Sequence, residues 1–393
     1  MIKILHISDI HFGAKLGNFS QNEEIKQALD FILAQIQLQN IDILVIAGDI
    51  FDKSNPSAEA ENSYYEFISK IYKLNITTVI ISGNHDNDIR LNAPQKILNQ
   101  NNIYIFSSLN TEVLKLKINN QDINFLPISY FSEEKLQEKL TELNIKIDTD
   151  KKNNIDYLYL KLLEHLYKNS NSDAIKIALG HLYIQNSEPV GNELPIQRGN
   201  LDQINFQLFN NLDINYFAFG HIHKFQKVSD NAFYSGSIIP ISIDESQNKK
   251  FMVMISFNEN SKQPEIETIE IPKFTNYYKF SGSFDEILQG INIAKSKNEI
   301  RNSFVSFEFL EQLTFEENHA VNNLIKELNL KVVSKSMTSQ DHKSKDFNLL
   351  RQEVKNLSVD KLFNKFLDSN KSLNKDLKIN LINKFNKIYE DNI

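Results

Sequence analysis

An uninterrupted run of five apolar residues, Ile43–Ala47, stops abruptly at Gly48 and Asp49. Short runs of this kind are typical of strands buried on both faces, as in parallel sheets. Comparable runs that end in polar residues lie at 2–7, 78–82, 175–179 and 216–219. Apolar residues at helical spacing predict a helix over 23–39, between the first two of these strands. A strand, a helix and a strand in this order predict a parallel β-α-β unit.

Further helices are predicted after the following strands. Asn55 as a cap, with Pro56 at the first helical position, predicts a helix that runs to about Leu74. A shorter helix is expected over 91–99 and an amphipathic one over 155–168.

The pattern changes beyond residue 112. Residues 113–118 and 123–128 alternate between apolar and polar side chains, which predicts a β-hairpin in a second sheet. The stretch 258–272 is expected to lead out of a main domain that covers residues 1–272. Residues 273–340 follow the order strand, helix, strand, helix, strand, which is typical of a compact α+β unit. Residues 347–393 show no strand signal and predict two amphipathic helices in a C-terminal tail.

Composition excludes several kinds of chemistry. The 393-residue chain has no Cys, so disulfides, Cys-ligated zinc and thiol catalysis are excluded together. Because no apolar run approaches the roughly 18 residues of a membrane helix, and no signal-peptide pattern opens the chain, we expect a soluble, cytoplasmic protein. The net charge of -7 is not the basic excess of a protein that holds DNA by charge alone. A nucleic-acid surface would have to be local, or supplied by metals or a partner.

Polar side chains suited to metal binding follow five of the predicted strands. In an extended backbone residues i and i+2 point the same way, so two ligands at that spacing can bind one ion. Each motif alone is weak, because a turn Asp or a satisfied His is commoner than a metal ligand. Five such motifs in one chain, all at strand ends, are a much stronger signal. The predicted ligands are Asp9, His11, Asp49, Asn84, His181, His221 and His223.

This ligand set indicates phosphoester chemistry. Imidazole and carboxylate ligands without sulfur suit divalent ions such as manganese, iron or zinc. We interpret Asp49 as shared by two ions about 3.5–4 Å apart, an arrangement that clamps phosphoester oxygens and lowers the pKa of bound water. His85, directly after Asn84, is expected to protonate the leaving oxygen or stabilise the phosphorane, with Asp52 as its orienting partner. His6, inside the first strand, is expected to be a core or edge histidine.

The motif order D-x-H, G-D-x-x-D, G-N-H-D, G-H, G-H-x-H is that of the calcineurin-like metallophosphoesterases, which the chain resembles over about residues 1–257. Within them it is similar to the family of nuclease subunits from bacterial SbcCD-type DNA-repair complexes. The closer match lies in GDIFDKSNP (48–56), LNAP (91–94), GHIHKFQ (220–226) and YSGSIIPISIDE (234–245). Relatives often have Pro at the position of Ile238, a change that leaves every ligand type in place.

The resemblance implies an α/β fold with four layers, α/β/β/α. It also implies that residues 273–340 form a small α+β capping domain for DNA and that the helical tail binds an SbcC-type ATPase. Two divalent ions, with manganese expected, would be bound. The implied ligands are Asp9, His11, Asp49 and His223 for one ion, and Asp49, Asn84, His181 and His221 for the other.

The implied activity is an ATP-dependent 3′–5′ double-strand exonuclease and single-strand endonuclease that acts in DNA repair and recombination. A homodimer through helices near 56–74 and 91–99 is implied as well. Two alternatives remain at this stage. A metallophosphoesterase for a small phosphodiester or phosphomonoester would share the whole metal site, although it would have no use for the extra 120 or so residues. A non-catalytic DNA-binding subunit would need a broken ligand set or a basic surface, and the sequence has neither.

Overall fold

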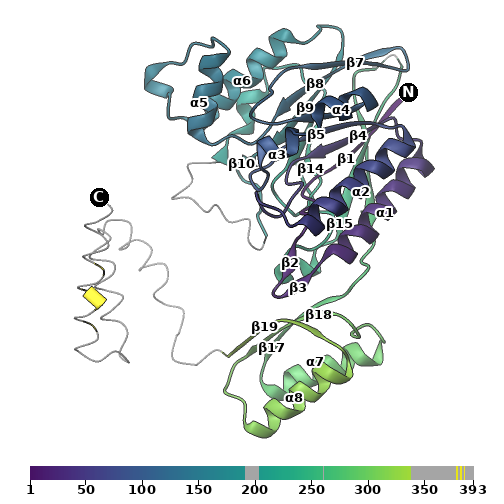
Figure 1. The fold of residues 1–393 in the computed structure, drawn as a ribbon, viewed down its shortest axis with the longest axis vertical. Helices are drawn as coiled ribbons and strands as arrows, with labels where there is room; N and C mark the ends of the chain where they lie inside the picture. Colours follow the sequence, from purple (N-terminus) through teal and green to yellow (C-terminus); the bar gives the residue numbers. More distant parts are fainter. Residues whose placement is uncertain (191–202, 260, 338–377, 379–380, 383–384, 386–393) are drawn as a thin grey trace. The chain divides into compact units, whose positions relative to one another are not determined.

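The structure is a computed structural model of the chain (Figure 1), which describes residues 1–190, 203–259 and 261–337 together with Lys378, Leu381, Ile382 and Phe385. The chain forms two compact units. One comprises Met1–Phe309 and Leu313–Ser336, and the other comprises Leu310–Gln312 and Met337–Ile393. The predicted tail at 347–393 therefore lies almost wholly outside the described residues. Its few described residues are helical.

The first sheet has six strands in the order β16-β15-β1-β4-β5-β6. The predicted β-α-β order is confirmed, because β1 pairs in parallel with β4, β4 with β5, and β5 with β6. Two antiparallel strands extend the sheet beyond β1. The bounds are β1 (Ile2–Ile7), β4 (Ile43–Ala47), β5 (Thr77–Ile81), β6 (Ile103–Phe106), β15 (Lys250–Phe257) and β16 (Glu265–Ile271).

The second sheet also has six strands, in the order β13-β14-β12-β9-β8-β7. The predicted hairpin is confirmed at its edge, where β7 and β8 are antiparallel. The bounds are β7 (Leu114–Ile118), β8 (Gln121–Ile128), β9 (Ile175–His181), β12 (Tyr216–Gly220), β13 (Gln226–Ser229) and β14 (Ala232–Tyr234). Two small ladders join β2 (Lys15–Leu16) to β3 (Phe19–Ser20) and β10 (Tyr183–Ile184) to β11 (Gln203–Ile204).

The two sheets face each other and helices cover their outer faces (Figure 1). Successive side chains along β1 point to opposite faces of the sheet, so both faces are buried. Ile4 packs against the second sheet, whereas Leu5 packs against the helices. The first sheet is covered by α1 (Asn22–Gln39), α2 (Ala58–Leu74), α3 (Asp88–Asn92) and α4 (Gln95–Leu98), and the second by α5 (Glu133–Glu142) and α6 (Ile155–Asn169). Short 3-10 helices occur at η1 (Asn99–Asn101), η2 (Thr149–Lys151), η4 (Phe206–Phe209) and η5 (Ile243–Gln247).

Residues beyond β16 form a three-stranded sheet with two helices and an apolar core of their own. The predicted order of elements is confirmed: β17 (Tyr277–Gly282), α7 (Phe284–Ser296), β18 (Phe304–Phe309), α8 (Phe315–Glu327) and β19 (Lys331–Met337). Capping boxes begin both helices. The sheet contacts the rest of its unit where Phe304 packs beside Leu16 and where Lys331 pairs with Glu24 at 3.0 Å.

Three sequence-based boundaries were wrong. Helix α2 begins after Ser57, whose side chain caps it, whereas Asn55 accepts a hydrogen bond from Arg90 outside the helix. The predicted helix over 91–99 is two short helices that break at Pro94. The stretch 258–272 contains a full edge strand, β16, paired with β15. Within the part of the chain that the structure describes, no helix is long and apolar enough to cross a membrane.

Candidate metal centre

The predicted ligands converge because the strands that precede them end at one place between the two sheets. Asp9 and His11 follow β1, and their N–H groups donate to the carbonyls of Gly48 and Asp49 after β4, at 3.1 Å each. Asn84 follows β5 in the same sheet. The second sheet supplies His181 at the end of β9 and His221 and His223 after β12.

Four of these residues have left-handed backbone conformations. The φ angles are 52° at Asp9, 54° at His11, 48° at Asp49 and 100° at His221. Side-chain-bearing residues rarely adopt such conformations, and those that do cluster at functional sites where the surrounding structure holds them in place. The turns after β1, β4 and β12 are therefore shaped to present a ligand at a cost in backbone energy.

Two glycines leave the space that these ligands occupy. A Cβ atom on Gly48, which has a φ of 90°, would lie 2.2 Å from Nδ1 of His181. A Cβ atom on Gly83 would lie 2.2 Å from Oδ1 of Asp49. Both distances are far inside van der Waals contact, so glycine is required for backbone and ligand to approach this closely.

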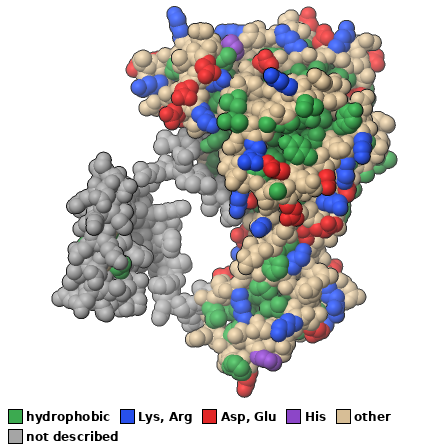
Figure 2. All heavy atoms as spheres, viewed as in Figure 1, with side chains coloured by type: hydrophobic (Ala, Val, Ile, Leu, Met, Phe, Trp, Pro, Cys, Tyr) green, Lys and Arg blue, Asp and Glu red, His purple; other side chains and the backbone are tan. Residues whose placement is uncertain are grey.

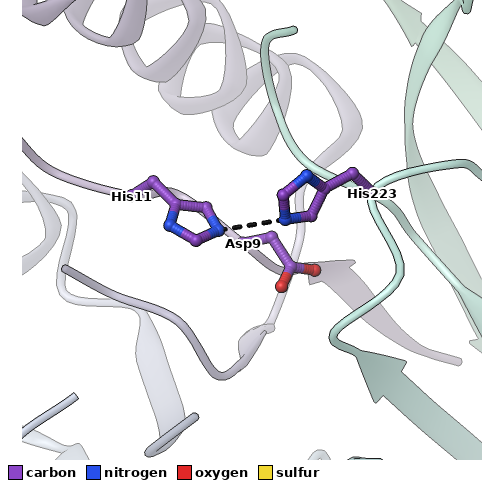
Figure 3. Close-up of side chains that lie close together, drawn as sticks. All are labelled: Asp9, His11 and His223. Carbon is purple, nitrogen blue, oxygen red and sulfur yellow. Dashed lines mark hydrogen bonds between the residues drawn. The ribbon is translucent and has the colours of Figure 1, made fainter. Parts of the chain in front are cut away.

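The first group of potential ligands is Asp9, His11 and His223, all buried (Figure 3). Nε2 of His11 and Nε2 of His223 face each other at 3.1 Å. Two donor atoms about 2.1 Å from one ion lie about 3 Å apart when they subtend a right angle. The spacing therefore fits two ligands of a single ion.

The second group is Asp9, Asp49 and His181, so Asp9 belongs to both groups. Oδ2 of Asp49 lies 3.3 Å from Nε2 of His181 and 3.7 Å from Nε2 of His11, which places this carboxylate between the two groups. Oδ1 of Asn84 lies 3.0 Å from Nε2 of His181 and 3.0 Å from Nδ1 of His221. All seven predicted ligands thus surround one small volume.

Hydrogen bonds fix the rings of two of the histidines. Nδ1 of His181 contacts the carbonyl of Ala47 at 2.9 Å, and Nδ1 of His223 contacts Oε1 of Glu245 at 3.1 Å. An acceptor at Nδ1 requires a proton there, so in the neutral ring Nε2 keeps its lone pair. Metal-binding histidines are commonly oriented in this way.

Buried charges perturb the pKa values of these groups. Burial by itself raises the pKa of Asp49, but His181 and His11 hold this pKa well below its usual range. Burial by itself lowers the pKa of His181, but Asp49 raises that pKa to about 9. Burial, with His181 beside it, lowers the pKa of His221 to about 3. A protonated His181 and an ionised Asp49 thus form a buried ion pair. A bound cation would take the place of the proton on His181 as the positive charge beside Asp49.

His85 is held beside this cluster. Its backbone N–H donates to Oδ1 of Asp49 at 2.9 Å, and its Nδ1 contacts the main-chain carbonyl of Asp52 at 2.7 Å. We expected the carboxylate of Asp52 to orient His85, but Oδ1 of that carboxylate lies 3.8 Å from Nδ1 of His11 instead. The geometry therefore corrects how Asp52 orients His85: the contact runs through the backbone.

Two further acidic residues shape the site, and the sequence reasoning gave neither a role. Asp86 accepts hydrogen bonds from the N–H groups of Ile50, Phe51 and Gly83, so it ties the turn after β4 to the turn after β5. Burial raises the pKa of Asp86 to about 7. Asp86 completes the motif G-N-H-D, and this was the available signal. Glu245, which contacts His223, is 22 residues away from it, so no local spacing indicates the pair.

The donor set fits divalent metal ions. The converging atoms are imidazole nitrogens and carboxylate or amide oxygens, in two groups that share Asp9 and are bridged by Asp49. Removing such a cluster of polar and charged atoms from water costs free energy, unless bound cations compensate for the lost solvation.

A phosphoesterase with a metal centre between two mixed sheets is the class of protein that this fold and site define. The profile of the calcineurin-like phosphoesterase family matches residues 2–225, more than half of the chain, and the chain belongs to this family. The chain is similar to the SbcD subunit of the nuclease SbcCD from Bacillus subtilis, with 26% identity over 377 residues, 93% of each chain. The resemblance that the motifs predicted is thereby confirmed.

Two other relatives carry the same name. The Escherichia coli (strain K12) protein is 27% identical over 284 residues, which are 69% of this chain and 68% of the relative. The Staphylococcus epidermidis protein is 27% identical over 300 residues, which are 76% of this chain and 77% of the relative. The similarity to the B. subtilis protein extends well beyond the family match, so it includes the region after the metal centre.

Proposed function

We propose that this protein is a DNA nuclease that uses two divalent metal ions, with manganese as the expected pair. The observation that carries the proposal is the pair of ligand groups joined by Asp9 and Asp49, with His85 fixed beside them. The substrate class rests on the similarity to the SbcD subunit of the nuclease SbcCD over 93% of the chain. The protein would act in DNA repair and recombination, as a double-strand exonuclease and single-strand endonuclease.

The side chains divide the work of phosphodiester cleavage. When bound, two divalent ions supply positive charge to the phosphate oxygens and acidify the attacking water. The seven ligand residues fix where that charge lies. The Asp52 carbonyl holds the proton on Nδ1 of His85, so Nε2 is the nitrogen that can donate a proton to the leaving oxygen or contact the phosphorane.

Residues 273–340 are proposed to form the DNA-capping domain. Their sheet and helices have their own core, and the same unit contains the metal centre. The tail at 347–393 is proposed to bind an SbcC-type ATPase, on which ATP-dependent activity would rest. The name of the relatives, a subunit of SbcCD, motivates this assignment.

We also propose a homodimer through α2, α3 and α4. Tyr65 and Tyr72 on α2, Ile89 on α3 and Ile97 on α4 are exposed, with 74% of Ile89 and 70% of Ile97 accessible. Figure 2 shows apolar side chains gathered on the face where α3 and α4 lie. Exposed apolar surface of this kind is typical of protein contacts.

Cleavage of DNA by the full chain in manganese, with and without the ATPase, tests the function. Asp49→Ala should abolish cleavage of every DNA substrate, because both ions lose a ligand at once. Near-normal manganese-dependent cleavage by this variant would show that the two-metal mechanism is wrong. A wild-type protein that hydrolyses only small phosphodiesters would favour the small-substrate alternative.

Truncation after Ser339 tests the role of the tail. The shortened chain should remain a manganese-dependent nuclease but should no longer co-purify with the ATPase. Undiminished binding of the ATPase by the shortened chain would place the contact elsewhere.

A further inference from the structure

Behind the metal ligand His223 lies an ion pair that is almost fully removed from solvent. Glu245, on η5, is 1% exposed, and Lys250, at the start of β15, is 3% exposed. Oε2 of Glu245 and Nζ of Lys250 are 2.5 Å apart. Charges are rarely buried this deeply unless they pair, and replacing such a pair by apolar residues is often neutral or stabilising. Fold stability alone therefore does not explain this pair.

Both members of the pair contact the same histidine. Oε1 of Glu245 accepts a hydrogen bond from Nδ1 of His223 at 3.1 Å, while Nζ of Lys250 donates to the main-chain carbonyl of His223 at 3.0 Å. Ser237 joins them, since its Oγ accepts from Lys250 at 2.7 Å and donates to Glu245 at 3.2 Å. The ring and the backbone of His223 are thus fixed from one side.

The position of Glu245 is itself set by local structure. Its Oε1 also accepts from the backbone N–H of Ser242 at 3.1 Å, which forms the capping box that begins η5. Lys250 and the N–H of Ser242 together hold the carboxylate in place, so that Oε1 is positioned to accept the proton on Nδ1 of His223.

The consequence falls on the opposite nitrogen of the ring. With its proton on Nδ1, His223 directs the lone pair of Nε2 toward Nε2 of His11, 3.1 Å away, and toward Asp9 (Figure 3). Without the acceptor, the ring is free to take the other tautomer or to rotate, and either change removes a ligand atom from the first group. Asp9 and His11, the two remaining members of that group, are held independently by hydrogen bonds between the turns after β1 and β4.

We propose that Glu245, held by Lys250, is a positioning residue that makes His223 competent to bind one of the two metal ions. The proposal deepens the proposed function and rests on it. It predicts a selective defect, in which affinity is lost for the ion on Asp9, His11 and His223, whereas the ion on Asn84, His181 and His221 is bound as before.

Calorimetric titration of the metal-free full chain with Mn²⁺ tests this without reference to cleavage. Glu245→Gln should bind one equivalent with wild-type affinity and the second 10- to 100-fold more weakly, the usual effect of losing such a partner. Glu24→Gln is the matched control, because Glu24 is also buried, at 3% exposure, but accepts from Thr275 and Lys331. The control should bind both equivalents like the wild type.

Glu245→Asp guards against a misfolded variant. It keeps the charge beside Lys250 but draws the oxygens back by about 1.5 Å, one carbon–carbon bond. The same selective weakening is expected, and excess Mn²⁺ should restore cleavage to near the wild-type rate, which a general structural defect would not allow. Two equivalents bound with wild-type affinity by both Glu245 variants would overturn the proposal. A wild-type chain that binds no Mn²⁺ would instead overturn the proposed function.

Discussion

In most histidines of this site the two ring nitrogens have different roles. In His181, His223 and His85, Nδ1 contacts a carbonyl or carboxylate oxygen and Nε2 remains for chemistry. His221 and His11 differ: Nδ1 of His221 faces the side chain of Asn84, and Nδ1 of His11 lies 3.8 Å from Oδ1 of Asp52. What the rings share is that neighbouring atoms, and not solvent, decide which nitrogen carries the proton.

His85→Ala should keep both metal ions and lose most turnover. The side chain contacts no member of the two ligand groups through a hydrogen bond, and loss of a positioned acid typically costs about 10²–10⁴ in rate. Metal content and rate should be measured on the same preparation. A variant that loses a metal equivalent would show that His85 is a ligand. Asp52→Asn should have a milder effect, because the carbonyl that contacts His85 is retained.

His6 should make stability depend on pH. The ring is fully buried and contacts the Tyr216 hydroxyl at 3.0 Å. Burial lowers its pKa from 6.5 to about 3. Between pH 6.5 and about 3, His6 therefore binds a proton in the unfolded chain but not in the folded chain. The contribution of neutral His6 to the free energy of unfolding is complete above pH 6.5. It decreases by about 1.4 kcal/mol per pH unit as the pH falls from 6.5 toward 3.

Urea unfolding between pH 6.5 and 4 measures this effect. His6→Gln cannot titrate, so its stability should fall less steeply with decreasing pH than that of the wild type. His319→Gln, on the exposed surface of α8, is the control and should follow the wild type. Equal slopes for His6→Gln and wild type would contradict the assignment.

Elements with a strong hydrophobic pattern could be predicted from the sequence, whereas the edge strand β16 could not. The buried parallel strands have uniform apolar runs, so β4 was found at its exact bounds. Strand β16 was missed because it is an edge strand whose glutamates face solvent, where strand and linker compositions overlap. The convergence of the seven predicted ligands could be expected because each lies at, or shortly after, the end of a strand. The role of Glu245 could not, because only the tertiary fold brings η5 to His223.

The turn after β5 should not tolerate a side chain at Gly83. In Gly83→Ala the new Cβ would meet Oδ1 and the backbone nitrogen of Asp49 at 2.2 and 2.4 Å, so the turn or the ligand must move. Mn²⁺ affinity should fall at least about tenfold. Gly290→Ala, inside α7, should leave Mn²⁺ binding unchanged. Calorimetry on both variants checks this, and unchanged binding by Gly83→Ala would show that the turn adjusts without cost.

At the scale of the whole molecule, the metal centre joins the two sheets. Asp9, His11, Asp49 and Asn84 follow strands of the first sheet, and the three remaining histidines follow strands of the second. Ions bound between them should therefore stabilise the folded chain. One site at a free concentration of 100 times its Kd adds about 2.7 kcal/mol.

Thermal unfolding with increasing Mn²⁺ measures this stabilisation. The wild-type Tm should rise with Mn²⁺ concentration, whereas Asp49→Ala should show little or no rise. A rise of equal size in both proteins would mean that the ions bind elsewhere.

The order of these residues along the chain also bears on when the enzyme becomes active during its own synthesis. Ligands occur from Asp9 to His223, and β15, which pairs with β1, ends only at Phe257. A ribosome must therefore release most of the first 257 residues before the catalytic centre can exist. A chain that ends before His181 contains only four of the seven predicted ligands: Asp9, His11, Asp49 and Asn84. Such fragments lack every ligand that the second sheet supplies, so we expect them to be inactive as nucleases.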